Sequence, residues 1–422
     1  MKKQNILIIS SGGREHAVGW KLSQSPHVGK IYFAPGNPGT ATIGINTGIP
    51  ALDFDTLIAF AKKNKIGLTV AGPDDILAAG IVNAFQKAGL KIFGPSKEAA
   101  IIESSKAFAK QLMQEENIPT ARYKTFTDSK KAKAYVAKNG TPIVIKASGL
   151  ALGKGVVIAY NQQEAEKAID DCMVNKIFGA SGAEVVIEEF LQGKEVSIHA
   201  FSDGKHISLF PTSRDHKPIF DGNKGPNTGG MGTIAPLTEV TAAQLKEIEK
   251  TIVKPLIRGM KKRGIPFVGC IYPGLMMTKD GPKVIEFNSR FGDPEMESYM
   301  RLLESDLFEI LTACVDGTLN NIKITWAKKA ACCIILASAG YPASSHKGDI
   351  ITGLDNVPDD VVVFHLGTKE LDGNIVTNGG RVVGITTTGK TLSEALSFAY
   401  QHIGKKGIHF DGMQYRKDLG KI

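Results

Sequence analysis

Apolar and polar positions alternate along the first hundred residues with the periods of strands and helices. Short apolar runs predict strands at residues 5–10, 30–34, 68–71 and 91–93. Amphipathic segments between them predict helices at residues 14–23, 54–63 and 76–88. Repeated strand–helix units favour a parallel sheet covered by helices, whose ligands bind at the carboxyl ends of the strands.

The pattern is mixed in the middle of the chain and β-rich near its end. It predicts helices at 105–116, 242–263 (broken near Pro255) and 302–313, alternating elements at 122–200, and paired strands at 267–277 and 283–288. After Trp326 it predicts strands at 331–338, 361–365 and 381–387 and one helix at 392–401. We therefore expect a multidomain protein of the α/β class, or α+β when its separate domains are considered together. Its expected parts are a parallel-sheet N-terminal domain at 1–103, a central region at 104–325 and a small β-rich C-terminal domain at 326–422.

The composition is that of a protein without a membrane segment. The 422 residues are 42% hydrophobic, and no apolar run reaches the ~18 residues of a membrane span. The first apolar run is too short for a signal peptide. The five cysteines form no C-x-x-C pair and no Cys/His set with zinc spacing. We expect a cytoplasmic protein with no membrane partner.

The formal net charge of +9 has two interpretations. Nucleic-acid binding is one of them, and attraction of small anionic substrates is the other. The Lys and Arg residues are scattered, and no basic run interleaves with aromatic residues. Small-molecule substrates are therefore favoured, no nucleic-acid partner is expected, and protein partners stay open.

The strongest chemical motif is a strand, a glycine-rich loop and a second strand at residues 142–157. The first strand delivers Lys146. The loop carries the small and basic residues Ser148, Gly149, Gly153, Lys154 and Gly155. Glycines let backbone N–H groups point at phosphate oxygens, and the spacing differs from that of a Walker A loop. An ordinary glycine-rich hairpin is the alternative, but the two flanking lysines favour a phosphate-binding flap.

Another strand, at 185–191, ends in two carboxylates followed by Phe190 and Leu191. The backbone from Glu189 to Leu191 is suited to pair with an adenine ring, and Glu195 is suited to accept from ribose hydroxyls. Taken alone the signal is weak, because glutamates at a strand end are usually only solvated.

The segment 284–295 combines a strand with a charged turn. Alternation places Glu286 and Asn288 on one strand face and Ile285 and Phe287 on the other. Two oxygen ligands at this spacing suit Mg2+, which keeps several phosphate or water ligands. A polar strand face is the alternative, but the Pro-fixed turn at 290–295 favours a site.

Two loops are candidates for substrate binding. The segment 214–232 is rich in glycine, amide and hydroxyl groups, which favours binding over a flexible linker. The loop at 10–17 joins the first strand to the first helix, so its N–H groups face any anion there. It lacks the G-x-G-x-x-G order, and no acidic residue follows the second strand at Ala34-Pro35, so NAD binding is disfavoured.

The order of these motifs resembles the ATP-grasp superfamily: a strand-delivered lysine, a glycine flap, a nucleotide hinge and a Glu-x-Asn strand. Their details resemble the glycinamide ribonucleotide synthetase (phosphoribosylamine–glycine ligase) family from about residue 5 to residue 420. Two stretches are highly specific, Gly225 to Gly232 and Glu286 to Glu295. Supporting stretches are 12–17, 34–37, 93–96, 105–108, 146–155, 377–382 and 415–420.

The resemblance implies that the central region has the ATP-grasp fold and that the reaction is the second step of purine biosynthesis. ATP, glycine and 5-phosphoribosylamine would give glycinamide ribonucleotide, ADP and phosphate by way of glycyl phosphate. ATP would be the co-substrate and Mg2+ or Mn2+ the metal. Another ATP-grasp carboxylate–amine ligase is the nearest alternative, and a non-catalytic nucleotide- or nucleic-acid-binding protein is a more distant one.

The resemblance also assigns roles to matched positions. Arg290, Asp293 and Lys146 would act at the reacting phosphates or the glycine, and Glu286 and Asn288 would bind the metal. ATP would be bound by Lys106, Lys146, Ser148, Gly149, Gly153, Lys154, Gly155, Glu188, Glu189, Phe190, Leu191 and Glu195. The other substrates would be bound by Gly12, Gly13, Arg14, Glu15, Asp215, Asn227, Thr228, Gly229, Gly230, Met231, Pro294 and Glu295.

Several positions depart from the pattern of the family, namely Ser10, Asp74, Ile76, Ser104, Pro218 and Asn223. Ser10 stands where the family normally has glycine. Pro218 stands where it normally has arginine, and Lys217 or Lys224 is expected to compensate for the missing cation. The expected ATP and metal positions are intact.

Overall fold

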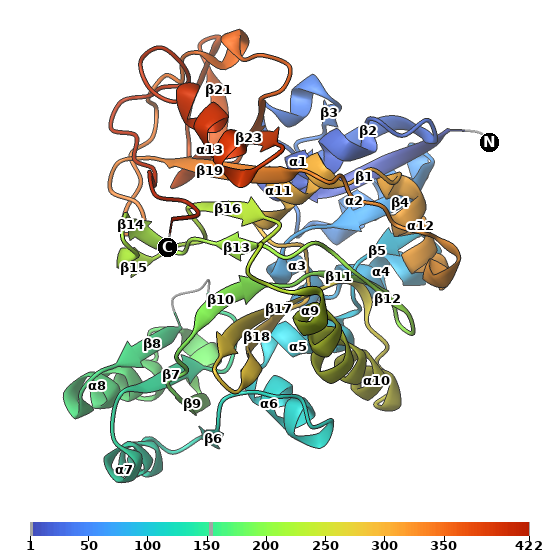
Figure 1. Cartoon of the computed structure of the whole chain (residues 1–422). Coiled ribbons are helices and arrows are strands. Elements are labelled where there is room, and N and C mark those ends of the chain that lie inside the picture. Colours follow the sequence, from blue (N-terminus) through green and yellow to red (C-terminus); the bar gives the residue numbers. More distant parts are fainter. Residues whose placement is uncertain (1–2, 152–154, 422) are drawn as a thin grey trace.

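The chain folds into an N-terminal parallel sheet, two central antiparallel sheets and a C-terminal antiparallel sheet (Figure 1). The computed structural model describes residues 3–151 and 155–421. The subdomain that carries β7 and β8 projects from the rest of the molecule on the side opposite the C-terminal sheet. The mixed α/β class, the parallel N-terminal sheet and the β-rich C-terminal part are as the sequence predicted.

The N-terminal sheet has the strand order β3-β2-β1-β4-β5, and every pair is parallel. Residues 6–9 of the central strand β1 are fully buried because helices cover both faces of such a sheet. The strands are β1 (Gln4–Ser10), β2 (Val28–Pro35), β3 (Ile45–Asn46), β4 (Ile66–Ala71) and β5 (Ile92–Phe93). The helices are α1 (Gly13–Leu22), α2 (Phe54–Lys63), α3 (Asp74–Ala79) and α4 (Ile81–Lys87).

Two predicted helices differ from the structure. The helix expected at 76–88 is split into α3 and α4 because Gly80 adopts φ +95°, which ends a right-handed helix. The helix expected at 302–313 is α12 (Leu307–Asp316), which begins at the N-cap Asp306. A separate helix, α11 (Glu295–Leu302), precedes it and was not predicted.

Two helices lead from the N-terminal sheet into the central region, α5 (Lys97–Ser104) and α6 (Lys106–Glu115). Ser105 separates them and caps α6 by accepting from the Phe108 N–H. The projecting sheet has the order β6-β9-β7-β8 and is covered by α7 (Ser129–Asn139) and α8 (Gln162–Met173). Its strands are β6 (Tyr123–Phe126), β7 (Ile143–Ala147), β8 (Val156–Ala159) and β9 (Val185–Glu189).

The second central sheet is built on the long strand β17 (Val268–Thr278). Its other strands are β10 (Lys194–Ser197), β11 (Ala200–Asp203), β12 (Ile207–Leu209) and β18 (Gly281–Asn288). The helix predicted at 242–263 consists of α9 (Ala242–Ile248), a π-helical stretch at Glu249–Val253 and α10 (Lys254–Lys262). The irregular stretch therefore lies just before Pro255, which is tolerated in the first turn of α10.

The C-terminal sheet has the order β13-β16-β19-β23-β20. Two of its strands, β13 (Arg214–Asp215) and β16 (Gly232–Ala235), precede residue 325, so the sheet crosses the boundary expected there. The others are β19 (Ala330–Ala337), β20 (Val362–His365) and β23 (Arg381–Gly389), and α13 (Leu392–Gln401) packs on β19 and β23. Two hairpins flank it, β14 (Pro218–Phe220) with β15 (Lys224–Asn227), and β21 (Thr368–Leu371) with β22 (Asn374–Thr377).

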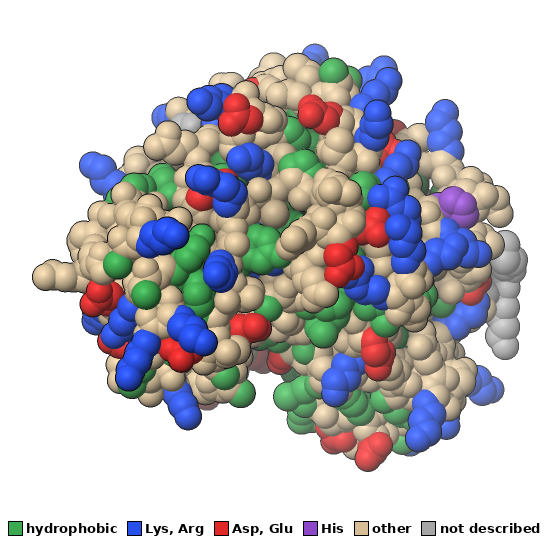
Figure 2. All heavy atoms as spheres, turned by 90° about the horizontal axis from the view of Figure 1, so that it is seen from below, with side chains coloured by type: hydrophobic (Ala, Val, Ile, Leu, Met, Phe, Trp, Pro, Cys, Tyr) green, Lys and Arg blue, Asp and Glu red, His purple; other side chains and the backbone are tan. Residues whose placement is uncertain are grey.

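Among the described residues, no helix combines the length and the apolar character needed to cross a membrane. On the face seen in Figure 2, Lys and Arg side chains are spread over many elements and are interspersed with Asp and Glu.

Ser10 has φ +126°, a region that residues with a Cβ rarely adopt. This backbone conformation gives a physical reason for the glycine that the family normally has there. We expect Ser10→Gly to raise the free energy of unfolding by about 1 kcal/mol, measured by urea titration. Ser10→Ala keeps the Cβ and should bring no gain; an equal gain in both variants would contradict this explanation.

A buried histidine pair joins the N-terminal and C-terminal domains. The His365 N–H donates to Nδ1 of His16 at 3.0 Å. Burial, together with His365, lowers the pKa of His16 to about 3, and burial lowers the pKa of His365 to about 4. Both folded-state values lie below the unfolded value of about 6.5. The unfolded chain therefore takes up protons first as the pH falls, and stability present above pH 6.5 is lost toward pH 4 and 3.

We expect each of these histidines to cost about 2 kcal/mol of stability when the pH falls from 7 to 5. His16→Asn keeps an acceptor near Nδ1 but does not titrate. Urea titrations at both pH values should show that this variant loses about 2 kcal/mol less than the parent chain. An identical loss in the two proteins would exclude His16 as the titrating group.

Candidate active site

One cavity of about 500 Å3 collects side chains from all three parts of the chain. Arg14 and Asp74 reach it from the N-terminal domain, and Arg381 reaches it from β23 of the C-terminal sheet. Ile102 and Glu103 reach it from the end of α5, and the other lining residues come from the central region, including β7, β8, β17 and β18. The predicted site residues, dispersed over the sequence, are therefore largely brought to one place.

The glycine-rich segment lies against the N-terminus of α6. The Ser148 carbonyl accepts from the Lys106 N–H at 2.8 Å, and the Ser148 hydroxyl accepts from the Ala107 N–H at 3.2 Å. The Lys106 ammonium donates to the Gly149 carbonyl at 3.3 Å and lines the cavity together with Gly155. Gly153 and Lys154, also predicted to bind ATP, lie outside the described residues.

A buried carboxylate, Glu188, lies between two lysines. Its oxygens form ion pairs with Lys146 at 3.0 Å and with Lys110 at 3.2 Å. The Lys146 ammonium also donates to the Ile285 carbonyl at 2.8 Å, which ties β7 to β18. Burial lowers the pKa of Lys110 to about 8, although Glu188 opposes this shift. The two lysines thus bring net positive charge to the cavity wall.

In the predicted adenine segment Glu188 is buried, and Glu189, Phe190 and Leu191 are partly buried. The Glu189 carboxylate accepts from the Arg122 side chain at 2.7 Å and from its N–H at 3.1 Å, so it is held at the strand end. Phe190 and Leu191 line the cavity. Within the described residues, no hydrogen bond uses their backbone N–H or C=O groups, which leaves these groups free to pair with a ligand.

The predicted metal ligands Glu286 and Asn288 both line the cavity. Burial would raise the pKa of Glu286, but Lys217, Lys146, Lys106 and Arg290 outweigh it, and the pKa is lowered. The carboxylate is therefore held in the charged form that a divalent cation requires. Ile285 also lines the cavity, contrary to simple alternation, because the pairing of β17 with β18 shifts register between Glu286 and Val284.

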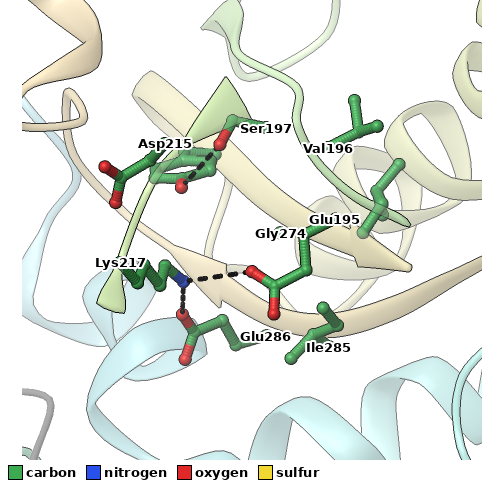
Figure 3. A pocket seen from close by; sticks show the side chains of 10 residues that line it. Glu195, Val196, Ser197, Asp215, Lys217, Gly274, Ile285 and Glu286 are labelled. Atoms are coloured by element: carbon green, nitrogen blue, oxygen red, sulfur yellow. Dashed lines mark hydrogen bonds and ion pairs between the residues drawn. The ribbon is translucent and has the colours of Figure 1, made fainter. Parts of the chain in front are cut away.

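Lys217 lies between the predicted ribose and metal carboxylates (Figure 3). Its ammonium is 3.7 Å from Glu286 and 3.9 Å from Glu195. Burial alone would lower the pKa of Lys217, but Glu195, Glu286 and other carboxylates raise it. Of the two lysines expected to compensate for Pro218, Lys217 thus lines the cavity and Lys224 is exposed. The Pro218 carbonyl accepts from Arg416 at 3.0 Å.

Arg290 is anchored by a carboxylate from the preceding domain. Glu103, at the end of α5, forms an ion pair with Arg290 at 3.3 Å and accepts from the Ser289 N–H and hydroxyl at 2.8 and 2.9 Å. Arg290 in turn donates to the Asn288 amide oxygen at 3.3 Å. Glu103 therefore orients two of the predicted site residues.

The predicted substrate residues divide into those that line the cavity and those that support it. The lining group is Arg14, Asp215, Asn227, Thr228, Gly229, Asp293 and Glu295. Glu15 accepts from Gly12 N–H at 3.0 Å and pairs with Arg14 at 2.5 Å, so it orients the loop from within. Gly13 packs against Glu297 and Leu366, and Gly230 packs against Asp215 and Pro294. Met231 is fully buried in a small apolar cluster, so its side chain belongs to the core.

Comparison with known proteins places the whole chain in one family. Residues 4–103, 104–296 and 331–422 match the N domain, the ATP-grasp (A) domain and the C domain of phosphoribosylglycinamide synthetase. The chain belongs to the phosphoribosylglycinamide synthetase family. The resemblance inferred from the motifs is thereby confirmed.

Individual relatives cover nearly the full length. The chain is 48% identical to a phosphoribosylamine–glycine ligase of Halalkalibacterium halodurans over 99% of this chain and 96% of that protein. It is 47% identical to one from Ralstonia nicotianae over 98% of both. A crystal structure of phosphoribosylamine–glycine ligase from Thermotoga maritima has a TM-score of 0.87 at 34% identity, covering 98% of this chain and 99% of that one.

The ATP-grasp fold extends to more distant structures. The biotin carboxylase domain of a Hydrogenobacter thermophilus 2-oxoglutarate carboxylase, solved with MgADP, has a TM-score of 0.74 at 14% identity. It covers 98% of this chain and 92% of that one, and at this identity the likeness concerns the fold alone.

Sequence reasoning missed three charged residues that line this cavity, Lys110, Glu103 and Arg381. Lys110 follows Lys106 by four residues on one helix, which places both on the same face and was a usable signal. Glu103 carried no local signal, because its partner lies 186 residues away. Arg381 lies in the stretch 377–382 that supported the resemblance, but its partner Gly229 is 152 residues away, so its contacts could not be inferred.

We expect Lys110→Met to weaken the binding of a non-hydrolysable ATP analogue by about tenfold, measured by calorimetry. Without Lys110, Glu188 has only Lys146 as a counter-ion and draws that lysine away from the phosphates. Lys133→Met removes an ion pair with Asp170 that lies outside the cavity and serves as the matched control. Unchanged affinity in Lys110→Met would show that Lys146 needs no second lysine.

Proposed function

We infer that this chain ligates glycine to 5-phosphoribosylamine with the use of ATP, giving glycinamide ribonucleotide, ADP and phosphate. It is an ATP-dependent phosphoribosylamine–glycine ligase of purine biosynthesis. The observation that carries this conclusion is the match of all three family domains, together with full-length relatives of that name at 47–48% identity.

The reaction proceeds in two displacements. A glycine carboxylate oxygen attacks the γ-phosphorus of ATP, the bond to the bridging oxygen of ADP breaks, and glycyl phosphate forms. The amine nitrogen of phosphoribosylamine then attacks the carbonyl carbon, phosphate leaves, and the nitrogen releases a proton. No side-chain nucleophile is required, so catalysis rests on position and charge.

The nucleotide end of the cavity is assigned to ATP. Phe190 and Leu191 offer free backbone groups to the adenine, and Glu195 offers a carboxylate to the ribose. Lys106 and Lys146 face the phosphates, and Ser148, Gly149 and Gly155 lie beside these lysines. Charge-assisted contacts of this kind are worth about 1.5–3 kcal/mol each.

Glu286 and Asn288 would hold a divalent cation, Mg2+ or Mn2+. The fit rests on a charged carboxylate and an amide oxygen on one strand, both lining the cavity beside the lysines that face the phosphates. Such a cation, when bound, neutralises charge on the phosphate oxygens. Arg290 and Lys217 place further positive charge around the transferring phosphoryl group.

The opposite end of the cavity is assigned to glycine and phosphoribosylamine. The Glu295 carboxylate suits the ammonium group of glycine, and Ser197 donates to it at 3.0 Å. Burial and the neighbouring Glu295 raise the pKa of Asp215 well above its usual range, so this carboxyl group is suited to hydrogen bonding with a substrate. Arg14 offers a cation to the sugar phosphate, and Asn227 to Gly229 offer amide and hydroxyl groups.

The deciding experiment measures ADP release by the purified protein with Mg-ATP. We expect ADP release only when both glycine and 5-phosphoribosylamine, generated in situ, are present. Glycinamide ribonucleotide should then form at the same rate as ADP. Dependence on a different carboxylate or amine would instead support another ATP-grasp ligase.

We expect Glu286→Ala to abolish turnover while the circular dichroism spectrum and unfolding midpoint stay close to those of the parent chain. The loss follows from removal of a charged metal ligand. Asp280→Ala, at the exposed turn of the same hairpin, is the matched control. Near-normal activity of Glu286→Ala would overturn the metal assignment.

A further inference from the structure

Arg381 connects the C-terminal domain to both walls of the substrate end of the cavity. Its Nη1 donates to the Gly229 carbonyl at 2.7 Å and to the Asp293 carbonyl at 3.0 Å. The same nitrogen lies 2.9 Å from the Asp293 carboxylate and 3.5 Å from the Gly230 carbonyl. One guanidinium group thus holds the loop before β16 and the turn after β18.

The loop packs closely on this guanidinium. A Cβ placed on Gly229 would lie 3.1 Å from the guanidinium carbon and 3.3 Å from Nε and Nη2. Such distances are tighter than ordinary van der Waals contact, so Gly229 and Arg381 fit each other directly. The fit requires both the small loop residue and the planar cation.

These contacts involve residues assigned to glycine and phosphoribosylamine and none of those assigned to the nucleotide. Gly229, Asp293 and Arg381 all line the cavity. The residues assigned to ATP phosphates, Lys106 and Lys146, are held by Gly149, Ile285 and Glu188 instead. Removal of the Arg381 side chain therefore releases the loop and the turn assigned to glycine and phosphoribosylamine, and it leaves the contacts of Lys106 and Lys146 in place.

We propose that Arg381 is a positioning residue that fixes the loop 227–230 relative to the turn 293–295, so that the C-terminal domain completes the pocket for glycine and phosphoribosylamine. The proposal rests on the proposed function for the identity of these substrates. Its structural part, the fixing of the two segments by Arg381, is independent of that identity.

The test compares Arg381→Ala, Arg381→Lys and Gly229→Ala with the parent chain. We expect Arg381→Ala to lower kcat/KM for phosphoribosylamine about 100-fold, as a misplaced substrate wall does, with unchanged affinity for a non-hydrolysable ATP analogue. Arg381→Lys should recover only part of the lost kcat/KM, because an ammonium group lacks the forked geometry of a guanidinium group. Gly229→Ala should lower kcat/KM for phosphoribosylamine by a smaller factor, again with unchanged affinity for the ATP analogue. Added guanidinium ion should partly restore the kcat/KM of Arg381→Ala.

Amide hydrogen exchange gives a readout that does not depend on turnover. In Arg381→Ala, faster exchange should be confined to residues 227–232 and 293–295. Arg301→Ala is the matched control, because Arg301 donates to the Asp360 carbonyl at 2.8 Å from outside the cavity. It should alter neither kcat/KM nor exchange in those two segments.

Two results would overturn the proposal. One is normal kcat/KM and normal exchange in Arg381→Ala. The other is a loss of ATP-analogue affinity or a spread of fast exchange over the whole C-terminal sheet, which would indicate general destabilisation. A parent chain that fails to use phosphoribosylamine would instead refute the proposed function, and the exchange measurement would still decide whether Arg381 fixes the two segments.

Discussion

The pairing of opposite charges inside one cavity is the constraint on which the arrangement of this molecule depends. Glu188 is paired with two lysines, Glu103 with Arg290, Asp293 with Arg381, and Lys217 with Glu195 and Glu286. In each of these sets, partners come from different secondary-structure elements, and buried charges without partners are strongly unfavourable. The charges that line the cavity therefore also hold the elements around it in their relative positions.

The same pairing explains how so many charged groups coexist in one place. Lys217 shows the principle, because its ammonium lies between two carboxylates that would otherwise repel each other. A cation held there offsets the carboxylate charge in the absence of ligands. Any divalent cation bound by Glu286 shares that carboxylate's field with Lys217, so metal binding and the position of this lysine are physically coupled.

Much of the fold followed from local pattern, and the failures have identifiable causes. The buried strand at 6–9 and the capped helix after Ser105 were predictable because apolar period and cap chemistry are local signals. The division of 76–88 at Gly80 was missed because a glycine inside an apolar periodic run is often tolerated in a helix. The helix at 295–302 was missed because its polar residues Glu295, Glu297 and Ser298 are buried together with its apolar ones, so its sequence pattern does not separate a buried face from an exposed one.

The candidate site was predictable to the extent that its residues sit in motifs. Lys146, Glu286 and Asn288 were selected from strand and loop patterns, and the structure brings them to one cavity. The supporting carboxylate Glu103 and the bridging cation Arg381 escaped notice because their roles depend on contacts across more than 80 residues.

The C-terminal sheet contains strands from the central region, and this has a consequence for synthesis of the chain on the ribosome. The parallel N-terminal sheet has all its strands once residue 93 has emerged. In contrast, β16 ends at residue 235 and must wait for β19, which begins at residue 330, and for β23, which ends at residue 389. During this interval the edge of β16 lacks its native neighbour, and unpaired strand edges are prone to aggregation. The late-emerging tail of the nascent chain thus protects a strand made much earlier.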